Sequence, residues 1–212
     1  MFLVRKILIL LFLIVTVASC NRHRNSASSE RIELGAAEYD VLTAWIDGTL
    51  TANKREKRPD QIVIYDNTDS DDNRFLRDDN GQPVSWEKFA ESLREKAPSL
   101  RQATLDAYRK ANANPALLRP RLHPLIRYQV VSMAQLEPIL GKGGSWYAYY
   151  KQFPSSQGLL TFSRVGFSPD GTQAFFYYSN ICEGLCGGGS YVVMQRQATV
   201  WVIDREIEMW VS

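Results

Sequence analysis

The apolar residues of this chain change their spacing in its last third, and that change limits the folds it can adopt. In the segments 36–52 and 85–111 they recur every three or four positions, which is the spacing of a helix that buries one face. From about residue 159 onward they follow short β-branched and aromatic runs, which are typical of strands. The sequence therefore predicts an α+β fold in which helices come first and strands follow.

Four segments carry helical signals. Residues 36–52 place Tyr39, Leu42, Ile46 and Leu50 on one face. Ser85 is a suitable N-cap for a helix that ends before Pro98, and "SLRQ" (99–102) reads as the capping box of the next helix. "SWYAYYKQF" (145–153) has four aromatic residues at helical spacing, which favours core packing over an exposed carbohydrate-binding surface.

Strands are predicted at 61–68 and 125–131 and throughout the last third of the chain. There, "SPDG" (168–171) predicts the turn of a β-hairpin, and two further strands follow within "SYVVMQRQ" and "TVWVIDREIEMWV". In the final strand, the alternation predicts one buried face, with Trp201, Ile203 and Ile207 on it, and one solvated face. The predicted architecture is N-terminal helices packed on a C-terminal four-stranded antiparallel β-meander.

The N-terminus carries an export signal. Arg5 and Lys6 precede an apolar run at residues 7–17, which is too short to span a membrane comfortably. "VASC" (17–20) resembles the lipobox of bacterial lipoproteins, with Val17 where that family most often has leucine. The resemblance implies cleavage before Cys20, lipidation of Cys20 and attachment to a membrane through that lipid. An uncleaved anchor helix, or an ordinary signal peptide cut near Ser19, is the alternative.

These features predict three segments. Residues 1–19 are the lipoprotein signal peptide, residues 20–33 are the lipidated N-terminus with a flexible tether, and residues 34–212 form a single α+β domain. Removal of residues 1–19 leaves 23 basic and 23 acidic residues. A net charge near zero argues against nucleic acid as a partner, because such binding depends on a basic surface.

The last third also resembles a known group of proteins. The segments "SRVGF" (163–167), "QAFFYY" (173–178), "CEGLCGGGSYV" (182–192) and "WVIDREIEMWVS" (201–212) look like those of a group of uncharacterised exported bacterial proteins. The resemblance carries no activity that can be transferred. It implies only that the strands of this region form a unit found in more than one exported protein.

Cys182 and Cys186 remain once Cys20 is assigned to lipid. Export would place them where disulfides persist, and their spacing lets the chain turn enough to bring the Cα atoms within bonding range. We therefore predict a structural Cys182–Cys186 disulfide, with Gly187, Gly188 and Gly189 supplying positive φ angles on the way into the next strand. A redox-active pair is the alternative, although such pairs more often show C-x-x-C at the start of a helix.

Catalytic and metal sites have weak support. His123 is the one histidine outside the tether, so a pair with Cys182 or Cys186 depends on geometry that sequence does not give. One cysteine pair and one histidine make a structural zinc site improbable. Six aspartates in the segment 66–79 could hold calcium, but they lack EF-hand spacing and are predicted to form a solvated loop.

Asp204, Glu206 and Glu208 are expected on one face of the last strand. That placement raises the carboxylate pair of a glycosidase, but any half-exposed strand shows the same alternation, so a solvated face is favoured. No catalytic residue, metal or cofactor is assigned. The sequence predicts a binding or structural module of the cell envelope, with a protein or glycan as partner. The alternative is an envelope hydrolase that uses His123 or the C-terminal carboxylates.

Overall fold

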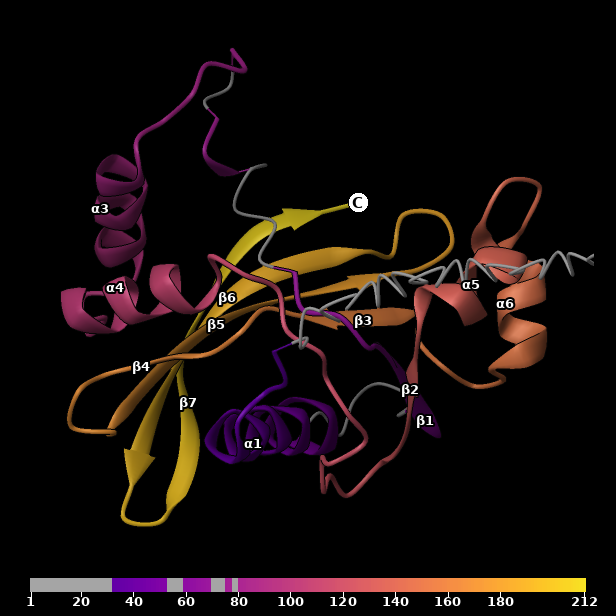
Figure 1. Cartoon of the computed structure of the whole chain (residues 1–212), viewed down its shortest axis with the longest axis horizontal. Helices are drawn as coiled ribbons and strands as arrows, with labels where there is room; N and C mark the ends of the chain where they lie inside the picture. Colours follow the sequence, from indigo (N-terminus) through magenta and orange to yellow (C-terminus); the bar gives the residue numbers. More distant parts are fainter. Residues whose placement is uncertain (1–31, 53–58, 70–74, 78–79) are drawn as a thin grey trace, which may run out of the picture. The chain divides into compact units, whose positions relative to one another are not determined.

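The computed structural model describes residues 32–52, 59–69, 75–77 and 80–212 (Figure 1). All of them belong to one compact unit, Arg31–Ser212. The predicted signal peptide, Cys20 and all but the last two residues of the predicted tether lie outside the described residues. Of those two, Ile32 accepts a backbone hydrogen bond from Leu117 and Glu33 forms an isolated β-bridge with Leu117.

The described residues form five helices and seven strands, in the α+β class that the sequence predicts. The helices are α1 (Ala36–Ala52), α3 (Trp86–Lys96), α4 (Gln102–Ala111), α5 (Met133–Leu140) and α6 (Trp146–Gln152). The strands are β1 (Gln61–Tyr65), β2 (Arg127–Val131), β3 (Leu159–Phe162), β4 (Gly166–Phe167), β5 (Gln173–Ile181), β6 (Gly188–Gln197) and β7 (Val200–Val211).

The strands form one mixed sheet rather than the expected four-stranded antiparallel meander. Its order is β2-β1-β3-β5-β6-β7, with β4 paired to β5. The strands β3, β5, β6 and β7 are antiparallel neighbours, whereas β1 runs parallel to both β2 and β3. The sheet is larger than expected because the two early strands join it at one edge instead of lying apart from it.

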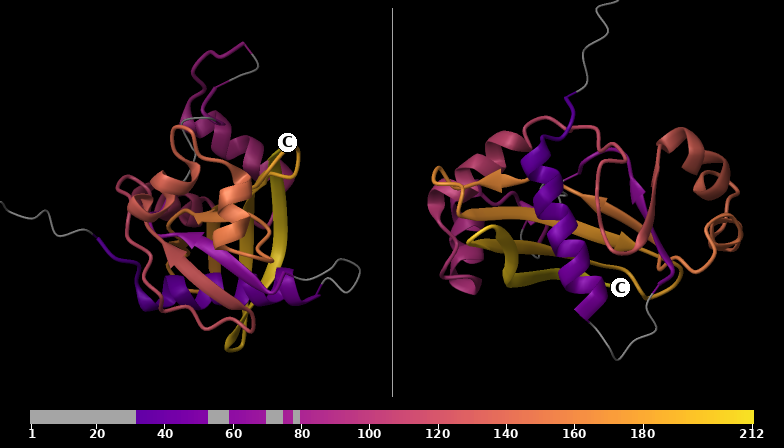
Figure 2. Two further views of the ribbon diagram at one scale, coloured as in Figure 1. Left: turned by 90° about the vertical axis from the view of Figure 1, so that its right-hand side faces the viewer. Right: turned by 90° about the horizontal axis from the view of Figure 1, so that it is seen from below.

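Helices cover both faces of the sheet, because alternate residues of each strand point to opposite sides. We call the side on which α1 lies the α1 face; Ile62, Phe176 and Val192 pack there with Trp45 of the helix. On the opposite face, α3 and α4 cover the β5–β6–β7 half, while α5 and α6 pack against β1, β2 and β3. Figure 2 shows α1 crossing the strands when the sheet is viewed from below.

The start of α1 is fixed by a buried carboxylate. Glu38 is 5% exposed and accepts hydrogen bonds from the backbone N–H groups of Gly35 and Val165. It also forms an ion pair with Arg164, with an Nη2 to Oε2 distance of 3.2 Å. Glu38 therefore ties the first turn of the helix to the segment that joins β3 and β4.

Aromatic rings fill the core beneath α3 and α4. Phe175 stacks on Tyr191 with ring centroids 5.2 Å apart, and Tyr108 of α4 meets Phe175 edge to face at 5.0 Å. All three side chains are fully buried. Burial of rings in edge-to-face and stacked pairs adds to the stabilisation that their buried area gives.

The cap of α4 differs from the sequence prediction. The side chain of Ser85 caps α3 as expected, but Ser99 donates its hydroxyl to Asp204 on β7 and α4 begins only at Gln102. The first turn of α4 is instead capped by the fully buried Gln173 of β5, whose Oε1 accepts from the Arg101 backbone N–H and from the Thr104 hydroxyl, each at 2.9 Å. A long-range contact thus replaces the expected local one.

The final strand β7 is an edge of the described sheet, and the expected buried face is wrong for most of its length. Of the apolar residues that alternate along it, only Ile207 is fully buried, while Ile203 is 36% exposed. Register shifts occur at two places along its pairing with β6, one of which skips Asp204 between Ile203 and Arg205. Such bulges reverse the faces of the residues beyond them.

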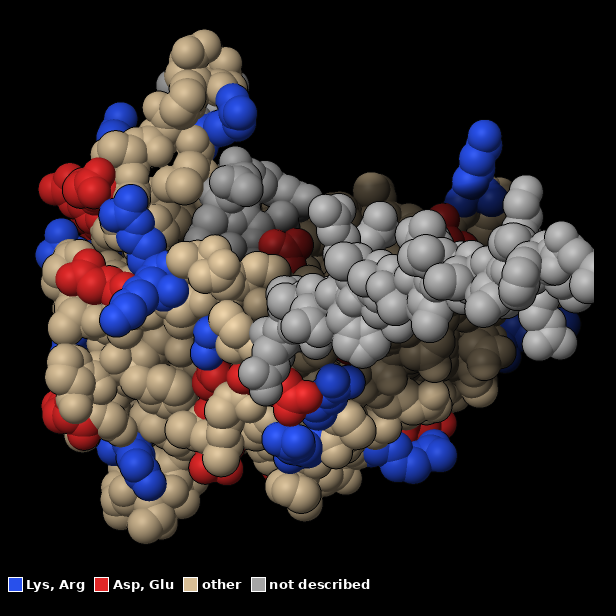
Figure 3. Space-filling model, viewed as in Figure 1, with Lys and Arg blue, Asp and Glu red and all other residues tan. Residues whose placement is uncertain are grey.

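Charged side chains on the surface are mixed in sign. In the view of Figure 3, basic and acidic side chains are interleaved over α3 and α4. One such pair joins Arg109 of α4 to Glu87 of α3, with an N to O distance of 3.5 Å, and both side chains are largely exposed. Exposed pairs of this kind contribute little to stability, and their alternation leaves no continuous basic patch over these two helices.

Candidate functional site

A pocket of about 160 Å³ lies on the α1 face, beside the last turns of α1. Its wall comes from α1, from the ends of β1, β3 and β5, and from the loop before β3. The residues that line it include Trp45, Thr49, Gln157, Leu160, Tyr178 and Asn180. The pocket therefore combines apolar and aromatic surface with several hydrogen-bonding groups, which is the composition typical of small-molecule sites.

Two aromatic residues, Trp45 and Tyr178, form one wall of the pocket, which we call the aromatic wall, and contacts hold it in place. The rings of Trp45 and Tyr178 lie with centroids 4.2 Å apart, and Trp45 meets Phe162 and Phe176 edge to face. The indole Nε1–H of Trp45 donates to Glu206 Oε1 at 2.9 Å. Packing and this hydrogen bond leave Trp45 with one orientation, so the wall is preorganised.

One polar atom of the pocket wall is left without a partner. Thr49 Oγ1 is buried and makes no hydrogen bond within the described part of the chain. A buried hydroxyl without a partner costs about 1–3 kcal/mol. A ligand hydroxyl or amide would remove that cost only if the Thr49 side chain turned toward the pocket, because its Oγ1 is buried in the structure.

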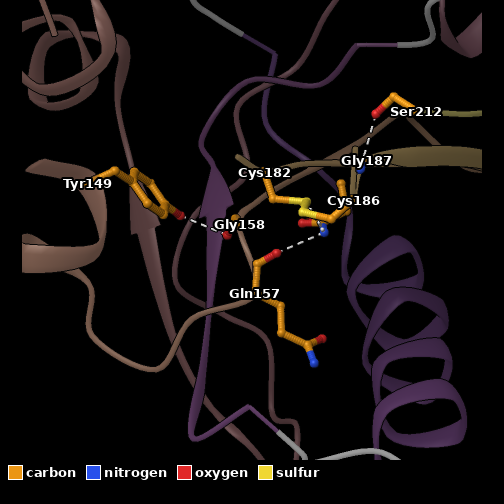
Figure 4. Close-up of a disulfide and its surroundings, with 8 residues drawn as sticks. Tyr149, Gln157, Gly158, Cys182, Cys186, Gly187 and Ser212 are labelled. Carbon is orange, nitrogen blue, oxygen red and sulfur yellow. Dashed lines mark hydrogen bonds between the residues drawn. A yellow bond between two sulfur atoms is a disulfide. The ribbon is translucent and has the colours of Figure 1, made fainter. Parts of the chain in front are cut away.

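The loop before β3 forms the rim of the pocket and is held from two sides (Figure 4). Tyr149 of α6 donates its hydroxyl to Gly158 O at 2.7 Å, and Asn180 Nδ2 donates to Gln157 O at 3.0 Å. Figure 4 also shows the amide of Gln157 extending away from the neighbouring disulfide. Gly158 has a φ of 120° and an added Cβ would overlap Ile181 O, so no other residue fits there without strain.

Cys182 and Cys186 lie next to this rim. Their Cα atoms are 5.8 Å apart, within the range that a disulfide requires, and the sulfur atoms are bonded in the structure (Figure 4). Asn180, whose side chain hydrogen-bonds the backbone of Gln157, is two residues from Cys182. The loop that the disulfide closes is therefore next to the pocket wall in the chain. The neighbouring Gly187 donates its N–H to Ser212 Oγ at 3.1 Å, which attaches the far side of the loop to the end of β7.

The glycines after Cys186 have a different role from the expected one. Gly184, inside the ring, has a φ of 74°, whereas Gly187, Gly188 and Gly189 do not have positive φ angles. Gly189 is needed for space: an added Cβ would overlap Tyr177 Oη and the indole nitrogen of Trp210. These two groups hydrogen-bond each other at 2.7 Å directly above the glycine. The requirement is therefore close approach and not backbone conformation.

The three carboxylates of β7 do not share one face, contrary to expectation. Because the bulge skips Asp204, this residue points to the opposite face and accepts from Ser99. Glu206 points to the α1 face, where it accepts from Trp45, and Glu208 follows on the same side opposite Ser190. The pattern of alternation could not reveal the bulge, so only two of the three carboxylates lie together.

Glu206 and Glu208 act on the pocket wall through their charge. Burial raises the pKa of the Tyr178 phenol above its ordinary value, and the negative charges of Glu206 and Glu208 raise it further. Tyr178 stands opposite Ser190, which in turn stands opposite Glu208 in the sheet. The two carboxylates therefore lie on the α1 face near Trp45 and Tyr178, but neither of them lines the pocket.

His123 lies at a different place on the molecule. It is exposed in a groove of about 650 Å³ between α1 and the β6–β7 turn, which Asp40, Asp47 and Arg196 also line. Its backbone N–H donates to Thr43 Oγ1 at 3.3 Å. Neither Cys182 nor Cys186 is among the described residues that line this groove, so the cysteine–histidine pair considered from sequence is not assembled there.

Metal ligands do not converge in the described part of the chain. No group of three or more His, Cys, Asp or Glu residues is placed to hold a metal ion among those residues. Of the six aspartates considered for calcium, Asp66 and Asp69 are described, and their backbone N–H groups bond to Val131 O and Phe162 O. The other four lie outside the described residues.

Comparison with family models, with curated proteins and with solved structures found no match. Within the described ranges, no helix has both the length and the apolar character that crossing a membrane requires. The site has to be interpreted from its own geometry.

Proposed function

We propose that this protein is an exported, lipid-anchored binding module of the cell envelope, and that the pocket on the α1 face binds one ring of a glycan. The "VASC" segment (17–20) supports the anchor, because it resembles a lipobox and ends in Cys20. A cysteine pair at bonding distance supports export, because disulfides persist in oxidising compartments.

The pocket carries the proposal for a glycan. Its volume of about 160 Å³ corresponds to roughly five water molecules, which is the scale of a single sugar ring. The half-buried Tyr178 offers apolar ring surface for the carbon face of a sugar and is backed by the buried Trp45, and the buried hydroxyl of Thr49 in the same wall lacks a partner within the described part of the chain. A protein partner would need about 800 Å² of matching surface, and a pocket of this size does not supply it.

A hydrolase has less support. The glycosidase idea needs two carboxylates that face one substrate. Asp204 points to the opposite face, and Glu206 and Glu208, which share the α1 face, do not line the pocket. Glu206 is already bonded to the indole of Trp45, which lines the pocket. His123 is exposed in another groove, so the two sets of residues named for this alternative do not form one site.

Isothermal titration calorimetry of the folded domain with soluble envelope glycan fragments tests the function. Thr49→Val keeps the shape of the side chain but removes the hydroxyl, so we expect affinity to fall about tenfold. Thr161→Val is the matched control, because Thr161 lies on β3 but points away from the α1 face. Absence of binding by the intact protein, or equal affinities of the two variants, would overturn the glycan proposal.

The anchor has its own test. Cys20→Ser cannot receive a thioether-linked lipid, so the variant should stay unprocessed or lose its membrane attachment. Mass spectrometry of the mature N-terminus of the unaltered protein, isolated from a bacterial host, decides the point. An unmodified residue at that N-terminus would contradict the lipoprotein assignment.

A further inference from the structure

We infer that Cys186 is a site of reversible thiol exchange, at which a small-molecule monothiol forms a mixed disulfide and Cys182 is released as a thiol. This inference does not depend on the proposed glycan function. Three observations support it: the unequal exposure of the two cysteines, a hydrogen-bond donor at the sulfur that would leave, and backbone contacts that hold both ends of the loop without the disulfide.

The two cysteines differ in their access to solvent. Cys182 is 7% exposed, whereas Cys186 is exposed, as are the three residues between them. Leu185, next to Cys186, is 89% exposed, and an added Cβ at Gly184 would meet no atom within 4 Å. An attacking thiolate has to reach the sulfur to which it bonds, so Cys186 is the member of the pair that a thiol in solution attacks. This asymmetry is present although the pair lies between two strands and not at the start of a helix.

The proposed step exchanges one disulfide for another. The thiolate bonds to Cys186 Sγ while the bond between Cys182 and Cys186 breaks, and the electron pair of that bond leaves on Cys182 Sγ, which takes up a proton from water. No oxidant or reductant is consumed. Attack of Cys182 on the mixed disulfide reverses the step, restores the original disulfide and releases the small thiol.

A hydrogen-bond donor lies at the sulfur that would leave. Asn180 Nδ2 donates to Cys182 Sγ at 3.9 Å, and the same amide donates to Gln157 O at 3.0 Å, which fixes its orientation. A donor binds a negatively charged acceptor more strongly than a neutral one. The amide of Asn180 therefore favours the departure of Cys182, and it does so beside the rim of the pocket.

Backbone contacts hold the ends of the loop independently of the disulfide. The ladder between β5 and β6 continues to the pair of Asn180 with Gly188. Gly187 donates its N–H to Ser212 Oγ at 3.1 Å, and its carbonyl accepts from the Ser212 N–H at 2.9 Å. Opening the disulfide therefore frees only the short loop, and we expect the modification to be reversible without unfolding of the sheet.

Mass spectrometry of the full chain, isolated without reducing agent and treated with millimolar glutathione, tests the inference. After an acid quench and unfolding, maleimide labels the thiol that was released. Both cysteines lie in one tryptic peptide, between Arg164 and Arg196, so fragmentation of that peptide assigns the two labels. We expect glutathione on Cys186 and maleimide on Cys182, in about tenfold excess over the reverse arrangement.

Two matched variants measure the access to each sulfur separately. Cys182→Ser leaves the thiol of Cys186, and Cys186→Ser leaves that of Cys182. In the folded state, Cys182→Ser should react with dithiodipyridine about tenfold faster than Cys186→Ser, and in urea the two rates should become similar. Circular dichroism confirms that each variant is folded. Equal rates in the folded state would overturn the inference.

Asn180→Asp tests the donor at the leaving sulfur. The carboxylate cannot donate and repels a thiolate, so glutathione should add to Cys186 about tenfold more slowly than in the unaltered protein. A variant whose loop was merely loosened would exchange faster, so the direction of the change separates the two effects. An unchanged or faster rate contradicts the role of Asn180. Glutathione on Cys182, an equal mixture of the two adducts, or exchange only after unfolding overturns the inference as a whole.

Discussion

The two faces of the sheet differ most clearly in burial along the edge strand β7, where consecutive residues point to opposite faces. Ile207 is 4% exposed and packs into the aromatic core beneath α3 and α4. Its neighbours Glu206 and Glu208 point the other way, to the α1 face, and are exposed. Two helices cover the opposite face over this half of the sheet, whereas the α1 face is covered by one helix, and the pocket lies beside the last turns of that helix over β1, β3 and β5.

The comparison indicates how stability and binding are divided in this protein. The opposite face carries rings that are fully buried, such as Phe175 and Tyr191, and offers no room for a ligand among them. The α1 face is well packed around Phe176 but less tightly packed at Tyr178, which is half-buried and lines the pocket. We therefore expect substitutions on the two faces to affect different measurements, and the following predictions test that division.

The largest effect should come from Phe175→Ala. This side chain is fully buried between Tyr108 and Tyr191, so its removal leaves a cavity and should lower the free energy of unfolding by about 3–5 kcal/mol. Tyr178→Ala, at the half-buried wall of the pocket, should cost about half as much but reduce sugar binding. Urea unfolding and calorimetry measure the two quantities. Equal losses of stability would show that the faces are packed alike.

A smaller loss should follow Glu38→Ala, which tests how α1 is held to its face. The substitution leaves Arg164 and two backbone N–H groups without their acceptor, so we expect unfolding to become easier by about 3 kcal/mol. Glu33→Ala is the control: it breaks an exposed ion pair with Arg119 and should change the free energy of unfolding far less than Glu38→Ala does. Similar losses in urea unfolding would mean that burial of Glu38 contributes nothing.

The smallest effect concerns acid stability at the turn that joins β4 to β5. Hydrogen bonds from Ser168 and Thr172, with the nearby Arg101, hold the pKa of Asp170 well below its ordinary value. A pKa that is lower in the folded state stabilises the fold above the unfolded value of about 4 and loses that contribution as the pH falls below it.

Asp170→Asn should therefore unfold more easily than the unaltered protein at pH 6, and the difference should narrow as the pH falls from 4 toward 2. Urea unfolding across this range measures it, with Asp60→Asn on an exposed loop as the control. If the difference in free energy of unfolding between Asp170→Asn and the unaltered protein stayed constant down to pH 2, the Asp170 hydrogen bonds would not be the source of acid sensitivity.

Local patterns predicted the elements better than their arrangement. The segment 36–52 is the helix α1, and the aromatic spacing at 145–153 produced α6 with Tyr149 fully buried. Each of these depends on residues within a few turns. The parallel pairing of β1 with β2 and β3 depends on no local signal, because strand direction is decided by connections that the pattern of apolar residues does not encode.

The candidate site was beyond sequence reasoning for a similar reason. Its residues come from α1, from β5 and from the loop before β3, and no motif joins them. The alternation of residues predicted Asp204 and Glu206 on the same face of β7. The prediction was wrong because the one-residue bulge at Asp204 leaves no signal in the pattern of apolar and polar residues. Likewise, the cap of α4 came from Gln173, a residue that local capping rules do not consider.

The position of β1 also bears on the order in which the chain can fold. β1 lies between β2 and β3, and Val63 pairs with Leu159, nearly one hundred positions later in the chain. Contacts between such distant residues form slowly, because a long loop must close before any of them contributes. A chain that has emerged only as far as α6 therefore has no partner for the second edge of β1. The sheet can be completed only when β3 arrives, and we expect folding to be delayed until the last third of the chain is available.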